Sequence, residues 1–195
     1  VAPVAVPVGA PLDRRGERRL HRHPVGEPVA GGRGAAGEYG HIPFGDPSLR
    51  CPCGARGCWD LTVDGRALAR HLGDPAPIDP IGYVHDLADR QDALSRSAFE
   101  KVATSLGRGI GALVNLHDPH VVTLGGVAAL VRAQAADAFD AAFLDALMAF
   151  RKASPPPVRD AEHGEDGPRQ GAIIAALDRV TTPDALAEWV ARQRD

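Results

Sequence analysis

The sequence predicts an α/β fold, and three observations support this prediction. A long amphipathic helical pattern covers residues 92–116, a short apolar run follows at residues 121–124, and a glycine pair then precedes an alanine-rich helical pattern. A helix, a buried strand, a glycine turn and another helix, in this order, are typical of a parallel sheet covered by helices. At 195 residues, the chain is long enough for one or two domains with a proper core.

The elements before this unit are shorter. Residues 61–73 predict an amphipathic helix in which Leu61, Leu68 and Leu72 share a face and Gly73 ends the helix. A proline-rich loop then leads to a helix near residues 83–89. In the long helix, apolar residues recur every three or four positions, and three glycines allow another element to approach closely. The apolar positions are Leu94, Ala98, Val102, Leu106, Ile110 and Leu113, and the glycines are Gly107, Gly109 and Gly111.

The elements after the glycine pair continue the pattern. Residues 127–150 predict one long helix that three consecutive prolines end, and residues 158–161 predict a further short strand. Residues 163–167 form a polar loop. Residues 168–180 predict a helix with Pro168 in its first turn, and Thr182 caps a last helix that begins at Pro183.

Composition excludes several classes of function. The formal net charge of -3 argues against a general nucleic-acid-binding surface. We find no apolar run long enough to span a bilayer, and the first residues place apolar side chains before charges, the reverse of a signal peptide. We therefore expect a cytoplasmic protein that does not bind membranes.

Residues 1–24 differ from the rest of the chain. Three prolines are followed by a stretch rich in arginine and histidine. We favour a disordered segment over a basic arm that contacts phosphate. Residues 25–37 are a glycine-rich loop with at most a short strand, and they lack the pattern of a phosphate-binding loop. The predicted folded domain therefore comprises residues 25–195.

The three cysteines of the protein lie within eight residues of one another, and a histidine precedes them. Cys51, Cys53, Cys58 and His41 supply the four ligands that a tetrahedral structural zinc site requires. The spacing C-x-C-x4-C needs a sharp turn, for which Pro52 and Gly54 are suited. The alternative is three buried thiols that bind no metal. The polar, glycine-rich surroundings favour zinc, Zn2+, in a loop that spans residues 41–58.

The glycine pair Gly125–Gly126 follows the predicted strand. The carboxyl end of a parallel strand is where α/β folds bind ligands, so these glycines are candidate nucleotide contacts. A simple turn is the alternative interpretation.

Several motifs together resemble the ROK family of sugar kinases and sugar-responsive repressors. The motif G-E-x-G-H spans residues 37–41, C-x-C-G-x-x-G-C spans residues 51–58, and G-R-A-L spans residues 65–68. The segment LVNLHDP at residues 113–119 and VVTLGG at residues 121–126 resemble the helix and strand of the family's second lobe. The resemblance covers residues 25–178.

This resemblance implies the second lobe of an actin-like, ribonuclease-H-like ATPase fold with a zinc-binding loop. It implies zinc at His41, Cys51, Cys53 and Cys58, and sugar contacts from Glu38 and His41. The family tends to have a glutamate two residues after the last cysteine, where this chain has Asp60, which we retain as a third sugar contact. The implied partners are a sugar or sugar phosphate and a second copy of the chain in a dimer.

The sequence also departs from the family's kinases. It contains no D-x-G-x-T phosphate loop and no N-x-D general base, so we assign no catalytic residue and expect no kinase activity from these residues. Residues 1–24 do not resemble the family, and we hypothesise that they are foreign or out-of-frame sequence joined to a ROK remainder near Val25.

Two functions from the family remain, together with one outside it. We favour the effector-sensing lobe of a ROK-type transcriptional regulator that lacks its DNA-binding domain, since Trp59–Asp60 replaces the kinase-like apolar–Glu pair. The alternative is a fragment of a ROK sugar kinase, which would use ATP and Mg2+. A small zinc-stabilised interaction module is the third interpretation, and it does not account for the α/β second half.

Overall fold

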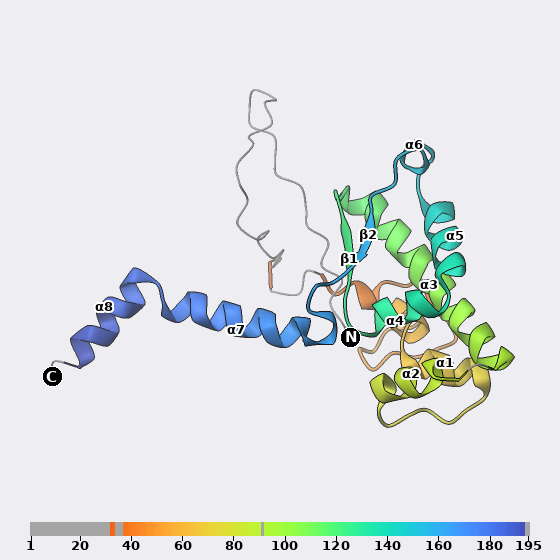
Figure 1. Ribbon diagram of the computed structural model, residues 1–195, viewed down its shortest axis with the longest axis horizontal. Coiled ribbons are helices and arrows are strands. Elements are labelled where there is room, and N and C mark those ends of the chain that lie inside the picture. The colour runs from red at the N-terminus through yellow and green to blue at the C-terminus, as the bar shows by residue number, and fades with distance from the viewer. Residues whose placement is uncertain (1–31, 34–36, 91, 194–195) are drawn as a thin grey trace.

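The computed structural model describes residues 32–33, 37–90 and 92–193. The predictions for residues 1–24 and for most of the glycine-rich loop lie outside the described residues. Figure 1 shows a largely helical body crossed by α3, from which α7 and α8 extend to one side.

The described elements follow one another in a simple order. Short 3-10 turns flank the cysteine loop, helices make up most of the rest, and two short strands lie between the helices. The elements are η1 (Tyr39–His41), η2 (Trp59–Thr62), α1 (Gly65–Leu72), α2 (Pro80–Ala88), α3 (Ala93–His117), β1 (Val122–Leu124), α4 (Val127–Gln134), α5 (Ala136–Ala146), α6 (Ala149–Lys152), β2 (Val158–Asp160), η3 (Gly164–Asp166), α7 (Gly167–Val180) and α8 (Pro183–Arg192).

Local signals predicted several helix ends correctly. The Asp92 carboxylate accepts a hydrogen bond from the backbone N–H of Ser95 and begins α3. Gly73 ends α1 in the left-handed conformation, with φ 76°. Thr182 caps α8, with Pro183 at its first position.

Three predictions about helices were wrong. Residues 127–150 form three helices instead of one, because the chain leaves the helical conformation at Ala135, with φ -148° and ψ 55°, and again at Leu147, with ψ 145°. Leu94, predicted to lie on the buried face of α3, is 73% exposed, because the first turn of the helix faces the core with Ser95, which is buried, and not with Leu94. The first helix also begins later than predicted, since the Asp64 carboxylate accepts from the N–H of Ala67 and starts α1 at Gly65, which leaves Leu61 in η2.

The predicted parallel strands are present but short. β1 and β2 run parallel, and Val122 pairs with Val158, Thr123 with Arg159, and Leu124 with Asp160. Within the described residues this sheet has two strands, so the domain is mostly helical. No helix of the described part is long and apolar enough to cross a membrane.

The core surrounds α3. Helix α5 packs closely against it, because an added Cβ at Gly107 would lie 2.3 Å from the carbonyl oxygen of Phe139. The predicted role of the helix glycines as close-approach positions is confirmed there. The largest fully buried side chains are Phe99, Phe139, Leu68, Leu87, Ile110, Leu113, Leu124, Val84, Val102, Val114, Val122 and Val131.

Candidate functional site

The structure brings the four predicted metal ligands together. One donor atom from each of His41, Cys51, Cys53 and Cys58 lies within 4.8 Å of all the others. The Cys51 sulfur is 3.7 Å from His41 Nδ1, and the Cys53 and Cys58 sulfurs are 3.6 Å apart. All three cysteines are free thiols.

These separations fit a single tetrahedral ion. Bonds of about 2.0 Å to nitrogen and about 2.3 Å to sulfur separate the ligand atoms of a tetrahedral zinc ion by about 3.5–3.8 Å. The Cys51–His41 distance of 3.7 Å and the Cys53–Cys58 distance of 3.6 Å agree with that separation. Three thiols and one imidazole could therefore hold one metal ion with little movement of their side chains.

The backbone of the cysteine loop makes this arrangement possible. The N–H of Gly54 donates to the carbonyl of Cys51 at 3.0 Å, and the N–H of Cys51 donates to the carbonyl of Ala55 at 2.9 Å. Gly54 has φ 97°, a conformation that favours glycine, so the tight turn predicted for C-x-C is confirmed. An antiparallel bridge between Arg50 and Arg56 closes the turn.

The thiols differ in how firmly they hold their protons. Burial, followed by hydrogen bonding with the Cys51 and Cys53 sulfurs, raises the pKa of the Cys58 thiol to about 12. The pKa of Cys53, the exposed thiol, is lowered, mainly by a hydrogen bond from the backbone of Ala55. A metal ion bound here would therefore displace a firmly held proton from Cys58.

The last cysteine is joined to the core through its neighbour. Trp59 is 3% exposed and packs against α3, where its indole Nε1–H donates to the carbonyl of Ser105 at 3.0 Å. The N–H of Trp59 also donates to the carbonyl of Ile42 at 2.8 Å. These contacts hold the His41 and Cys58 segments of the loop side by side on the body of the domain.

The two ring nitrogens of His41 face different partners. Nδ1 lies 3.7 Å from the Cys51 sulfur, and Nε2 lies 3.8 Å from the carboxylate of Glu38. The Glu38 side chain is 70% exposed, so its carboxylate remains accessible beside the imidazole. The structure therefore places the first two predicted sugar contacts, Glu38 and His41, next to each other.

Asp60 lies close to the same segment. An added Cβ at Gly40 would lie 3.2 Å from the Asp60 Cβ, so the G-E-x-G-H motif passes directly over this side chain. Burial and then repulsion from Asp64 raise the pKa of the Asp60 carboxyl. Glu38, His41 and Asp60 thus belong to one region of the described surface.

The glycine pair has a different environment. Gly126 follows β1, has φ 58° and precedes α4, as predicted for a turn at the end of the strand. Its N–H donates to the carbonyl of Gly164 at 3.2 Å. Because this donor is already used within the chain, the turn also serves to hold η3 beside β1.

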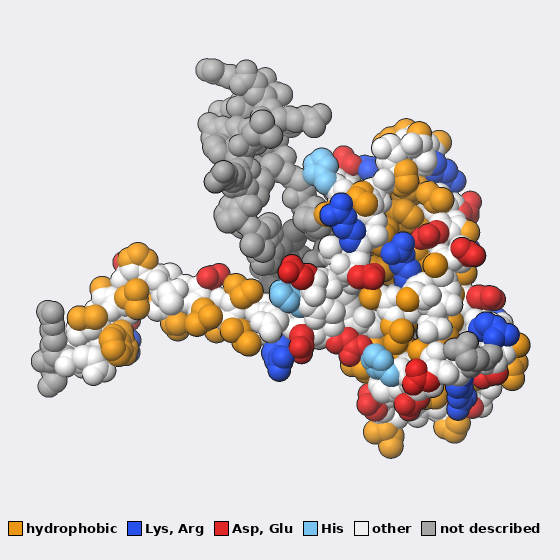
Figure 2. Space-filling model, viewed as in Figure 1, with side chains coloured by type: hydrophobic (Ala, Val, Ile, Leu, Met, Phe, Trp, Pro, Cys, Tyr) orange, Lys and Arg blue, Asp and Glu red, His pale blue; other side chains and the backbone are white. Residues whose placement is uncertain are grey.

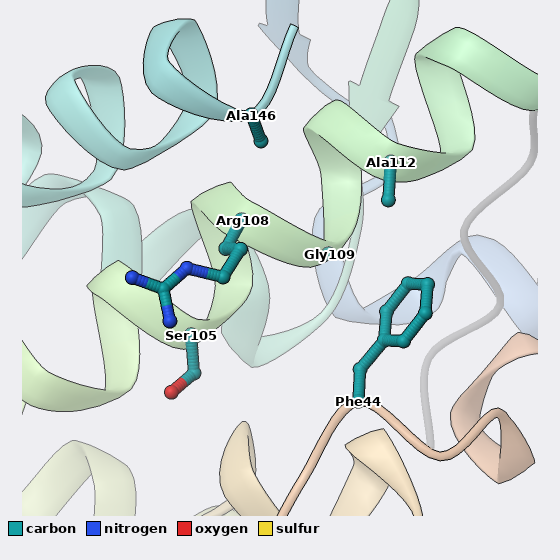
Figure 3. A pocket seen from close by; sticks show the side chains of 6 residues that line it. All are labelled: Phe44, Ser105, Arg108, Gly109, Ala112 and Ala146. Atoms are coloured by element: carbon teal, nitrogen blue, oxygen red, sulfur yellow. The ribbon is translucent and has the colours of Figure 1, made fainter.

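A cavity that we did not predict lies beside the cysteine loop. It has a volume of about 260 Å³. Figure 3 shows the ring of Phe44 facing α3, with the Arg108 side chain on the other side of Gly109. None of the three predicted sugar contacts lines it. The spacing of the α3 glycines was the available signal, since a groove forms where side chains are small. The lining residues are Phe44, Ser105, Arg108, Gly109, Ala112 and Ala146.

A comparison with models of known protein families shows to which family the chain belongs. The ROK family matches residues 25–179, which is most of the chain. The chain belongs to the ROK family. The resemblance carried by the cysteine motif is thereby confirmed.

Curated ROK relatives include kinases for different sugars. The chain is 32% identical over 111 residues to the glucokinase of Streptomyces coelicolor, a match that covers 48% of the chain and 35% of the relative. It is 29% identical over 153 residues to the N-acetylmannosamine kinase of Yersinia pestis, covering 76% of the chain and 49% of the relative. The chain therefore spans half the length or less of the curated relatives it matches.

Solved ROK structures share the fold. A glucokinase from Streptomyces griseus, in complex with glucose and AMPPNP, has a TM-score of 0.56 at 26% identity, covering 68% of this chain and 48% of that one. A ROK transcriptional regulator, a homologue of the Escherichia coli MLC protein, has a TM-score of 0.54 at 22% identity, covering 67% of this chain and 36% of that one. The fold is therefore that of ROK proteins, both kinases and regulators.

Proposed function

We propose that this ROK chain is a sugar-binding lobe whose binding loop is ordered by one structural zinc ion, bound by His41, Cys51, Cys53 and Cys58. The observation that carries this proposal is that the two ring nitrogens of His41 face different partners, Nδ1 the Cys51 sulfur and Nε2 the Glu38 carboxylate. With Nδ1 on the metal, the imidazole keeps its proton on Nε2, so this nitrogen donates in a fixed direction. Glu38 lies beside it and accepts hydrogen bonds. One donor and one acceptor in fixed positions are suited to adjacent sugar hydroxyls.

Asp60 is the third proposed contact. Its half-buried carboxylate would accept a hydrogen bond from a further hydroxyl, and burial, followed by repulsion from Asp64, raises its pKa. Buried acceptors of this kind discriminate strongly against analogues that lack the hydroxyl.

Sugar binding tests this proposal directly. Glucose and N-acetylmannosamine are titrated calorimetrically into zinc-loaded protein, because these are the sugars of the kinases that the chain resembles. Glu38→Gln should weaken binding by roughly tenfold or more, since a hydrogen bond to a charged group contributes about 1.5–3 kcal/mol. Glu100→Gln, which changes an exposed glutamate on α3 in the same way, should leave binding unchanged. Zinc-loaded protein that binds neither sugar would contradict the proposal.

Within the family, we propose the effector-sensing lobe of a transcriptional regulator as the role of this lobe. Asp60 in place of the glutamate of the sugar kinases supports this assignment. The DNA-binding domain of such a regulator would be separate from residues 25–195.

The second candidate, part of an ATP-dependent sugar kinase, is favoured by a different observation. The three kinases named above are 26–32% identical to this chain, whereas the transcriptional regulator is 22% identical to it. The Gly125–Gly126 turn at the end of β1 is then the proposed nucleotide contact, with Mg2+ bound alongside ATP. Calorimetry with AMPPNP separates the candidates: the regulator assignment predicts sugar binding without nucleotide binding, and the kinase assignment predicts both.

A further inference from the structure

The most reactive side chains of this protein are its sulfur-containing ones. Figure 2 shows acidic, basic and hydrophobic side chains mixed over the face of the body that it presents, so that face carries no strong charge of one sign that would attract an ion. The sequence contains three cysteines and one methionine. All three cysteines are free thiols within the cysteine loop, where the proposed zinc ion would hold them as thiolates, the nucleophilic form of cysteine.

These three thiols differ in how far they are open to solvent. Cys53 is exposed, whereas Cys51 is 7% exposed and Cys58 is fully buried. The two neighbours of Cys53 in the chain, Pro52 and Gly54, are exposed as well. A small reagent in solution therefore reaches the sulfur of Cys53 first.

The exposed thiol has a buried thiol beside it. The sulfurs of Cys53 and Cys58 are 3.6 Å apart. Because the bond of a disulfide is about 2.05 Å long, these two sulfurs need to approach each other by about 1.5 Å to form one. The Cys51 sulfur lies 3.7 Å from Nδ1 of His41. Cys58 is therefore the thiol best placed to react with Cys53.

The two sulfurs also differ in how firmly the fold holds them. The Cys58 sulfur lies 3.7 Å from the carbonyl oxygen of His41, and Trp59, the next residue, is packed in the core. Cys53 lies in an exposed turn, and no described atom lies within 4 Å of the position that a Cβ would take at Gly54. The turn that carries Cys53 therefore has space to move toward Cys58 without disturbing the core.

We propose that Cys53 is a site of oxidation by hydrogen peroxide or another peroxide, and that the product is a disulfide with Cys58 that releases the zinc ion. This inference rests on the proposed zinc site, because a metal-bound cysteine is already the thiolate that a peroxide oxidises. Cysteines that sense oxidants are accessible to solvent and often lie next to a second cysteine that closes the disulfide. Cys53 and Cys58 have this arrangement.

The oxidation takes place in two balanced steps. First, the Cys53 thiolate attacks one oxygen of hydrogen peroxide, the O–O bond breaks, and Cys53 becomes a sulfenic acid while hydroxide leaves. Second, the Cys58 thiolate attacks the Cys53 sulfur, the S–S bond forms, the S–O bond breaks, and a second hydroxide leaves. The two sulfurs together lose two electrons, which reduce one peroxide to two hydroxide ions.

The disulfide takes two of the four ligands away from the metal. His41 and Cys51 remain, and two ligands do not complete the four-coordinate site that structural zinc requires. Zinc therefore leaves, and the imidazole of His41 no longer has one nitrogen fixed on a metal. Peroxide should in this way weaken the proposed binding of sugar by Glu38 and His41.

Peptide mapping after oxidation tests this inference. The full zinc-loaded chain is treated with hydrogen peroxide, its remaining thiols are alkylated, and it is digested with trypsin. Trypsin cleaves after arginine and gives separate peptides of residues 51–56 and 57–66. A disulfide between Cys53 and Cys58 joins these two peptides, and fragmentation should then find the alkyl group on Cys51.

The same samples report on the metal and on the dose of oxidant. A zinc-binding dye should detect one zinc ion released per chain as the joined peptides form, and dithiothreitol followed by zinc should restore the parent. Met148, the only methionine, is 40% exposed, so its conversion to the sulfoxide measures the dose of peroxide. The joined peptides should form at a dose that leaves Met148 unoxidised.

Two aspartate variants form a matched pair, because a carboxylate can replace a thiolate as a zinc ligand. Cys53→Asp removes the oxidation site, so it should retain its zinc in peroxide and give no joined peptides. Cys51→Asp keeps the reactive pair, so it should give the joined peptides as the parent does. Since Cys51 is buried, its variant is judged by the peptide map, which needs no metal.

Three results would overturn the inference. The first is a zinc-loaded parent in which Met148 is oxidised before any joined peptides form. The second is a disulfide that lies within residues 51–56 or that joins Cys51 to Cys58. The third is a chain that contains the Cys53–Cys58 disulfide and still holds its zinc. The zinc content before oxidation tests the proposed function separately, so a parent without zinc and a zinc-loaded parent without joined peptides are distinguishable failures.

Discussion

The indole ring of Trp59 lies directly against Gly109 on α3. A Cβ added at Gly109 would be 2.1 Å from Cε2 of the indole, and the indole N–H donates to the carbonyl of Ser105 at 3.0 Å. Trp59 follows Cys58, the last proposed metal ligand. Through this contact the cysteine loop is packed on the central helix, so metal binding and core packing are physically linked.

Gly109→Ala tests this contact. The added methyl group overlaps the indole, which must move away from α3, and such overpacking costs about 1–3 kcal/mol. We expect a lower free energy of unfolding in urea and a weaker affinity for zinc, because the displaced Trp59 pulls on Cys58. A variant with parental stability would show that the ring does not fill this space.

Gly171→Ala is the matched control. Nothing lies within 4 Å of the position that its Cβ would occupy in α7. Since alanine favours helix over glycine by about 0.5–1 kcal/mol, this variant should be as stable as the parent or slightly more stable. The two glycine variants should therefore change stability in opposite directions.

Asn115 joins α3 to the end of α5. Its side-chain amide donates to the carbonyl of Ala146 at 2.8 Å and accepts from the N–H of Met148 at 3.1 Å. Asn115→Ala leaves both backbone groups without this partner and should lower the free energy of unfolding by about 1–3 kcal/mol. Gln134→Ala, which removes one long 3.4 Å bond to Ala88, should have a smaller effect in the same denaturation experiment. If the two variants lost equal amounts of unfolding free energy, the pair of hydrogen bonds made by Asn115 would be no more important than the single bond made by Gln134.

The lowered pKa of Asp92 predicts that the stability of the protein depends on pH. Hydrogen bonds from the backbone and then the side chain of Ser95 hold the pKa of this carboxyl below its ordinary value. A carboxyl whose folded-state pKa is lowered contributes stability that is present above its unfolded pKa and is lost as pH falls through its folded pKa. The melting temperature of the parent should therefore fall toward that of Asp92→Asn below about pH 4. Asparagine still caps the helix, so a constant difference between the two proteins across this range would contradict the prediction.

Local rules predicted much of the fold. The cap at Thr182 follows from a side chain that satisfies a nearby backbone group, and the stop at Gly73 follows from the left-handed conformation that glycine adopts easily. Both signals lie within a few residues of the helix ends. The break at Ala135 could not be predicted in this way. Alanine is the best helix former, so the break depends on how α4 and α5 pack, which a local pattern does not contain.

For the candidate site, too, local sequence patterns predicted the local features but not the long-range packing. The clustering of Cys51, Cys53 and Cys58 was sufficient to predict a metal site, because ligands close in sequence can converge without long-range packing. The contact of Trp59 with Gly109 joins distant segments, and the glycines of α3 predicted a close approach without identifying the partner. Likewise, the pattern of residues 168–180 predicted a helix, but it contained no information on whether the apolar face is covered.

The zinc content of the purified protein tests the central claim most directly. Elemental analysis is performed on the parent, on Cys53→Ser and on Ala55→Ser, which places the same hydroxyl at an exposed position of the loop that has no ligand. We predict one zinc ion per chain in the parent and in Ala55→Ser, and loss of zinc with a lower melting temperature in Cys53→Ser. Because Cys53 is exposed, its substitution leaves no cavity, so the fall would report the loss of metal. A folded parent that contains no zinc would contradict the account and would remove the physical basis for a sugar contact by His41.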